Sequence, residues 1–140
     1  MRAMSSWLFP ILTYLVTQNP RWETIVPQSG SPPARSGHTA SVYDFKIYVF
    51  GGADADYFYN DIWCFDTRAL TWTPIPASGY LPTGRYGHSC ALVDGVLYIF
   101  GGNSPDGTEL NDAYAFKING KHSLDSLQTT IGRLGNGNGS

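Results

Sequence analysis

Short apolar runs alternate with polar, glycine-rich segments along most of this chain. Residues 89–93 and 96–100 flank Asp94-Gly95, a pair that strongly favours a two-residue β-hairpin turn. The matching runs at 39–43 and 46–50 enclose Asp44-Phe45, which fits such a turn less well and predicts a distorted or longer connection. Runs at 61–65 and 71–75 complete a set of four predicted strands. The pattern predicts an all-β fold.

This set of runs recurs at an interval of about 50 residues. The sequence RSGHTA at 35–40 returns as RYGHSC at 85–90, and IYVFGG at 47–52 returns as LYIFGG at 97–102. The sequence NDIWCF at 60–65 returns as NDAYAF at 111–116, one residue later than the other blocks. Several blocks at nearly one spacing indicate a tandem structural repeat.

A repeat of this length, with four strands and a Gly-Gly pair after the second, is typical of a β-propeller blade. The glycines are expected to end the second strand, where a Cβ would obstruct a sharp exit or a close backbone neighbour. A blade hides the two faces of its sheet by stacking against neighbouring blades. Aromatic side chains that follow the repeat are therefore predicted between blades: Trp22, Trp63, Trp72 and Tyr114.

These blocks resemble the kelch motif element by element, most strongly over residues 22–117. The resemblance implies a partial kelch β-propeller with two four-stranded antiparallel blades and part of a preceding blade. Residues 59–65 and 105–117 are also similar to the kelch propellers of fungal cell-end polarity proteins, which organise cortical partners. The residues that the motif implies as structural are Arg35, Gly37, His38, Gly51, Gly52, Trp63, Trp72, Arg85, Gly87, His88, Gly101, Gly102 and Tyr114.

Extending the repeat in both directions divides the chain into four parts. Residues 1–28 are predicted to form strands of a preceding blade, and residues 29–78 form the first kelch repeat. Residues 79–124 form the second, with an incomplete fourth strand, and residues 125–140 form a disordered glycine-rich tail. Two and a half blades leave open strand edges. We therefore expect a fragment, a truncated gene product, or a piece that associates with other copies through these edges.

Charge and cysteine content narrow the range of partners. The net charge of −2 and the absence of any Lys/Arg cluster argue against nucleic acid and against anionic membranes. Cys64 and Cys90 are isolated, which favours reduced thiols in a cytoplasmic protein. The apolar residues 6–16 are alternatively a secretory signal, but Pro10 interrupts them and the preceding blade accounts for them.

The repeated polar residues favour structural roles over chemistry. His38 and His88 occupy one repeat position without metal-ligand spacing nearby, so we expect them to bond backbone groups at the start of each blade. Arg35 and Arg85 also recur, and we expect them to form hydrogen bonds from blade to blade. We predict no catalytic residue, no metal and no cofactor.

The loops offer the candidate binding residues. Loops 53–59 and 103–110 are expected to share one end of the propeller with the connections 27–34 and 77–84. Asp54 and Asp56 have calcium-like spacing but lack the rest of a calcium loop. Tyr57, Phe58 and Tyr59 are adjacent aromatic residues in this polar loop, and one or two of them alternatively cap the blade core. The predicted partner contacts are Asp54, Asp56, Tyr57, Phe58, Tyr59 and Asp106.

We therefore predict a non-catalytic kelch protein-interaction module, a scaffold or adaptor related to cell polarity or the cytoskeleton. Its partner is expected to be a protein. One alternative is a fragment of a galactose-oxidase-like kelch enzyme, whose copper site draws Tyr, Cys and His ligands from several blades. Another is a truncated product that has no independent activity.

Overall fold

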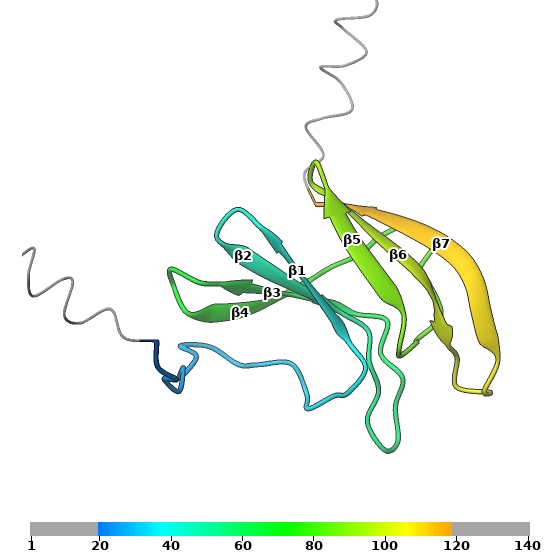
Figure 1. The fold of residues 1–140 in the computed structure, drawn as a ribbon, viewed down its shortest axis with the longest axis horizontal. Coiled ribbons are helices and arrows are strands. Elements are labelled where there is room, and N and C mark those ends of the chain that lie inside the picture. The colour runs from blue at the N-terminus through cyan, green and yellow to red at the C-terminus, as the bar shows by residue number, and fades with distance from the viewer. Residues whose placement is uncertain (1–19, 119–140) are drawn as a thin grey trace, which may run out of the picture.

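The computed structural model describes residues 20–118 as two antiparallel β-sheets (Figure 1). These described residues include no helix that is long and apolar enough to cross a membrane. The strands of the first sheet follow chain order: β1 (Thr39–Tyr43), β2 (Lys46–Phe50), β3 (Ile62–Asp66) and β4 (Thr71–Ile75). Those of the second do so as well: β5 (Ser89–Val93), β6 (Val96–Asn103) and β7 (Glu109–Lys117). The predicted all-β architecture of stacked blades is confirmed.

The two sheets fan outward from their first strands. Strands β1 and β5 contact each other at the inner margin, while β4 and β7 lie on the outside (Figure 1). The second sheet has three strands within residues 20–118. The predictions for residues 1–19, for the fourth strand of the second repeat and for the tail at 125–140 lie outside the described residues.

The hairpin turn between β1 and β2 corrects one expectation. Tyr43 pairs with Lys46, so the connection has two residues, as it has between Val93 and Val96 in the second repeat. Of the two predicted alternatives, a longer turn is wrong, whereas a distorted turn agrees with the structure, because Phe45 lacks the positive φ that Gly95 has at the same repeat position. Asp44 takes a φ of 57°, which Asp tolerates better than most residues, and no positive φ is needed at Phe45.

The Gly-Gly pairs behave differently in the two repeats. In the first, β2 ends before the pair, and a Cβ on Gly52 would lie 2.9 Å from the carbonyl oxygen of Ser36. In the second, β6 continues through the pair to Asn103, with a bulge between Phe100 and Gly102. The expectation that the glycines end the strand is therefore wrong in the second repeat, because the longer β7 keeps pairing with β6 as far as Asn103.

The hydrophobic core lies between the two sheets. Its buried members from the first sheet are Tyr48, Phe50, Ile62 and Cys64, and those from the second are Leu97 and Ile99. Burying a large apolar side chain contributes about 1.5–3 kcal/mol, so this stacked interface is the main source of stability. Each sheet depends on the other to cover one of its faces.

The four aromatic residues predicted between blades have different surroundings. Tyr114 packs against the core between the sheets, as expected. Trp72 packs on Phe65 of the same sheet, with ring centroids 4.9 Å apart, and Trp63 donates from Nε1 to Asp61 of its own repeat. Trp22 is fully exposed, because residues 20–26 form no strand that would return it to a sheet. The prediction is therefore wrong for Trp22 within residues 20–118.

The outer edge of the first sheet is closed to further pairing at its centre. The hydroxyl of Ser29 accepts a hydrogen bond from the backbone amide of Trp72 and donates one to its carbonyl oxygen. Pro74, also in β4, has no amide hydrogen to offer. Strand β4 therefore presents few free backbone groups to another chain.

Candidate functional site

The loop between β2 and β3 is organised by Asp54. Its Oδ1 accepts hydrogen bonds from the amides of Asp56 and Tyr57, at 2.9 and 2.8 Å. Its Oδ2 accepts a third from the hydroxyl of Tyr59 at 2.5 Å, and this bond, followed by the amide bonds, lowers the pKa of Asp54. The carboxylate thus holds its own loop in one shape, while Asp56 lies exposed beside it.

The three adjacent aromatic residues of this loop separate into different environments. Tyr59 is buried, and its ring lies beneath the guanidinium of Arg35 at 3.8 Å. Phe58 is half-buried and makes an edge contact with Tyr86, whose ring centroid is 5.5 Å away. Tyr57 remains 57% exposed. Tyr59 therefore belongs to the interior, and Tyr57 and Phe58 are left at the surface.

Tyr86 is a surface residue that the sequence reasoning missed. It stands where the first repeat has Ser36, inside a motif whose other positions are nearly constant, and that substitution was the available signal. Its ring contacts Phe58, and its backbone exchanges two hydrogen bonds with Asn103. Tyr86 therefore connects the loop of the first repeat to that of the second.

The loop of the second repeat is a tight turn between Asn103 and Glu109. Ser104 and the amide of Thr108 donate hydrogen bonds to the carboxylate of Asp106, and these bonds lower the pKa of Asp106 to about 2. Asp106 is exposed. The turn and the loop 51–61 both lie at the lower end of the molecule in Figure 1. Their common end agrees with the prediction from strand polarity.

These side chains form one surface, which we call the loop surface. It joins aromatic rings, of which Phe58 is half-buried, and exposed carboxylates that come from both repeats. Its members are Asp54, Asp56, Tyr57, Phe58, Tyr86 and Asp106. Because the two loops are tied to the sheets by backbone bonds, the surface is preformed.

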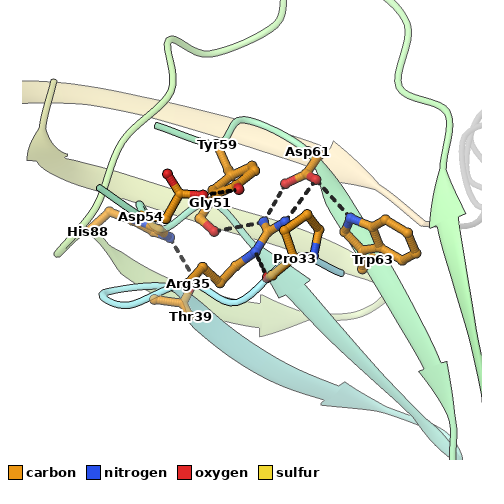
Figure 2. Close-up of polar contacts among 9 residues, drawn as sticks. All are labelled: Pro33, Arg35, Thr39, Gly51, Asp54, Tyr59, Asp61, Trp63 and His88. Atoms are coloured by element: carbon orange, nitrogen blue, oxygen red, sulfur yellow. Dashed lines mark hydrogen bonds and ion pairs between the residues drawn. The ribbon is translucent and has the colours of Figure 1, made fainter. Parts of the chain in front are cut away.

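A buried arginine supports each loop from beneath. Arg35 donates to both carboxylate oxygens of Asp61, at 2.6 and 3.1 Å, and to the carbonyl oxygen of Gly51 (Figure 2). Burial raises the pKa of Asp61, but the bonds from Arg35 and Trp63 outweigh it, and the net shift is downward. Arg85 makes the same contacts with Asp112 and Gly101.

The expected blade-to-blade role of these arginine side chains is wrong. Both guanidinium groups bond within their own repeat, because the paired aspartate belongs to the third strand of the same sheet, with Asp61 directly before β3 and Asp112 within β7. The backbone joins the repeats instead. The amide of Gly52 donates to the carbonyl of Arg85 at 2.8 Å, and the amide of Arg85 donates to the carbonyl of Tyr59.

The two histidines differ in environment. His38 is exposed, whereas His88 is buried and bonds through Nε2 to the hydroxyl of Thr39, at 2.7 Å, in the other sheet (Figure 2). Burial and then the charge of Arg85 lower the pKa of His88 to about 4, so the ring is neutral at physiological pH. Its bonded partner is a side chain and not the expected backbone group. Within residues 20–118, no three His, Cys, Asp or Glu side chains gather as metal ligands.

A pocket opens between the sheets beneath residues 77–82, which connect β4 to β5. Its lining is mostly apolar and includes residues of the connecting segment. The lining residues include Phe50, Ile62, Leu97, Ile99, Tyr80 and Leu81. This pocket is continuous with the core and adds apolar surface near the loop between β2 and β3.

Comparison with known proteins agrees with this geometry. The model of the KLHDC2/KLHL20/DRC7 Kelch-repeats domain matches residues 7–130. Tip elongation aberrant protein 1 of Schizosaccharomyces pombe is 51% identical over 111 residues, which are 79% of this chain and 10% of that protein. Kelch domain-containing protein 3 of Bos taurus is 43% identical over 61 residues, 42% of this chain and 16% of that protein.

A plant relative has the name of an enzyme. N-(sulfonatooxy)prop-2-enimidothioate sulfolyase of Thlaspi arvense is 39% identical over 61 residues, 41% of this chain and 18% of that protein. The chain thus spans about a tenth to a fifth of the length of these relatives.

Two stacked blades, the repeated Arg–Asp pairs and the match to the Kelch-repeats domain agree, and the chain belongs to the kelch-repeat family.

Proposed function

We propose that this chain is a protein-interaction module whose partner binds the loop surface. The observation that supports this most directly is the exposure of Tyr57 and Tyr86 on loops fixed to rigid sheets. Tyrosine is enriched in protein interfaces because it offers a large contact area at a low cost in conformational entropy. A preformed surface also avoids the entropy cost of ordering loops on binding.

We further propose that the module acts without catalysis. The carboxylates of Asp54, Asp61, Asp106 and Asp112 each accept hydrogen bonds from donors of this chain, which fits structural roles. The buried imidazole of His88 is likewise bonded to a side chain of the fold. Elemental analysis of the purified chain tests the competing copper-enzyme hypothesis, since stoichiometric copper would contradict our proposal.

The loop surface can be tested with a paired substitution. Tyr57→Ser/Tyr86→Ser removes two exposed rings, whereas Phe45→Ser removes an exposed ring from the opposite, hairpin end of the first sheet. We expect cross-linked partner recovered from source-cell extract to fall at least about tenfold with the double variant, because central aromatic residues dominate interface energies. Phe45→Ser should leave recovery unchanged. Equal recovery with both variants would remove the loop surface from the proposal.

We also propose a role in cell polarity, in a scaffold of the cytoplasm. Support comes from the 51% identity to a protein named for aberrant tip elongation. The test is to replace the matching segment of that fission yeast protein with this chain. Normal tip elongation in the chimera would support the proposal. Aberrant elongation with normal protein levels would contradict it.

A further inference from the structure

One face of the second sheet is exposed although its counterpart in the first sheet is buried. Tyr98 and Phe100 occupy the repeat positions of Tyr48 and Phe50. The exposed fraction rises from 5% at Tyr48 to 38% at Tyr98, and from 2% at Phe50 to 47% at Phe100. Strand pairing places neighbouring small apolar residues on the same side. We call this the open face: Ala91, Val93, Tyr98, Phe100, Ala113 and Ala115.

The structure itself shows what covers such a face. In the first sheet the equivalent residues are covered by Leu97 and Ile99, which point from the second sheet toward the first. The repeat places Ile47 and Val49 at the same positions on the far side of the first sheet. We call that side the outer face: Ala40, Val42, Ile47, Val49, Trp63 and Phe65. One copy therefore carries the equivalents of both halves of the contact that joins its own two sheets, with Val42 exposed on the outer face and Val49 and Phe65 buried there.

Specific contacts across the internal interface also have unmade counterparts. Thr39 bonds His88 at 2.7 Å, and the equivalent residues Ser89 and His38 are both exposed. The hydroxyl of Ser89 lies on the open face, and the imidazole of His38 lies beside the outer face. These two groups fit a hydrogen bond between two copies like the one that joins Thr39 to His88 within a copy.

Two further contacts follow the same correspondence. Phe50 meets the ring of His88 edge-on at 5.2 Å, and Phe100 would meet His38 in the same way. Ser41 of the first sheet donates to Cys90 of the second at 3.6 Å, and Ala91 and Ala40 occupy the equivalent positions. The alanines replace a weak polar contact with an apolar one, which preserves the close approach of the strands.

We propose that the open face binds the outer face of a second copy of this chain, so that copies stack head to tail and continue the propeller. Such a contact is heterologous, because the two copies use different surfaces, and it forms a ring when the rotation closes. Propellers close with about four to eight blades, so a ring closes when the stacked copies together supply that number. The occupant is the second copy, because the chain already contains the complementary sheet.

The mass of the full chain in solution tests this proposal. We expect light scattering after gel filtration to show oligomers at high protein concentration. Phe100→Asp on the open face and Val42→Asp on the outer face should each give monomers with an unchanged circular dichroism spectrum. Tyr80→Asp, at a residue 94% exposed in the connection between the sheets, is the control and should keep the wild-type mass.

Mixing the two monomeric variants distinguishes head-to-tail stacking from other contacts. Phe100→Asp retains an intact outer face and Val42→Asp an intact open face, so the mixture should form a one-to-one dimer and nothing larger. A variant pair that stays monomeric would overturn the proposal. Dimers of Val42→Asp alone would also overturn it, because they would show that open faces pair with each other.

A cross-link checks the register of the contact. Ala91→Cys in one protein and Ala40→Cys in another should form a disulfide-linked heterodimer, because Ser41 and Cys90 meet at the equivalent internal position. Ala69→Cys, in the exposed turn between β3 and β4, is the control and should not cross-link to Ala91→Cys. A wild-type chain that stays monomeric at high protein concentration would overturn the proposal.

Discussion

The guanidinium of Arg85 is entirely buried and donates hydrogen bonds to both carboxylate oxygens of Asp112, at 2.5 and 2.9 Å. The same arrangement joins Arg35 to Asp61 in the first repeat. Each pair ties the segment before the first strand of a blade to its third strand, at Asp61 directly before β3 and at Asp112 within β7. The pairs therefore hold the loop end of each blade together.

Removing the carboxylate of one pair should be costly. Asp112→Leu leaves the buried charge of Arg85 without its bidentate partner, and we expect a loss of about 2–4 kcal/mol in the free energy of unfolding. The double variant Arg85→Met/Asp112→Leu removes both charges and should recover part of that loss. Urea unfolding followed by fluorescence measures both. The exposed pair Arg21–Glu23 is the control, and Glu23→Gln should change stability by less than about 1 kcal/mol. Equal, small effects at Glu23 and Asp112 would contradict the proposed role.

The buried His88 should make stability depend on pH. Its pKa falls from 6.5 to about 4 in the folded protein, so the unfolded chain binds the proton more readily. Stability is then complete above pH 6.5 and declines as the pH drops toward 4, by roughly 1–3 kcal/mol. His88→Gln should flatten the curve of unfolding free energy between these values. His38→Gln, measured in dilute protein, is the control and should leave the slope unchanged, and a slope that survives in His88→Gln would exclude His88 as its source.

The close approach of the two repeats near the loop surface depends on Gly84. A Cβ at this position would overlap the carbonyl oxygen of Phe58, so the connecting segment and the loop cannot both keep their places. We expect Gly84→Ala to lower the unfolding free energy by about 1–3 kcal/mol and to weaken partner binding. Gly30→Ala is the control, because a Cβ there meets nothing within 4 Å. If both glycine variants match the wild type, the loop is not held against the second repeat.

Asp54 should control the order of the loop surface more than its neighbour Asp56 does. The Asp54 carboxylate accepts bonds from two amides and one hydroxyl, whereas Asp56 takes part through its backbone amide. We expect Asp54→Ala to speed amide hydrogen exchange at residues 56 and 57 and proteolytic cleavage of the loop. Asp56→Ala should leave both rates close to those of the wild type. Similar exchange rates in the two variants would contradict the organising role of Asp54.

The repeat predicted the fold because strand positions, hairpin turns and blade stacking all follow from local pattern. The sequence predicted the fourth strand of the first blade at 71–75, as observed. The third strand was predicted at 61–65, one residue earlier than the observed Ile62–Asp66. Where the repeats differ, prediction failed. The extra residue before Asn111 lengthens the hairpin of β6 and β7, and Gly101-Gly102 becomes a bulge inside a strand. That outcome depends on pairing between strands, which periodicity alone does not show.

The candidate surface was predicted only in part. Loop position identified Tyr57 and Phe58, but burial of Tyr59 depends on where the guanidinium of Arg35 lies. The Arg–Asp pairs were missed because their partners lie 26 and 27 residues apart in the chain. Each residue recurred visibly in the repeat, and their shared recurrence was the available signal. Contacts between distant segments require the three-dimensional arrangement.

The closed outer edge of the first sheet has a consequence for how copies of this chain avoid aggregation. Pro74 in β4 has no amide hydrogen, and both backbone groups of Trp72 are already bonded to Ser29. An extended segment from another polypeptide therefore meets few free backbone groups at this edge. Recruitment of strands into fibrous aggregates is thereby discouraged along that margin, and contact with other molecules is directed toward side chains, whose shapes discriminate between partners.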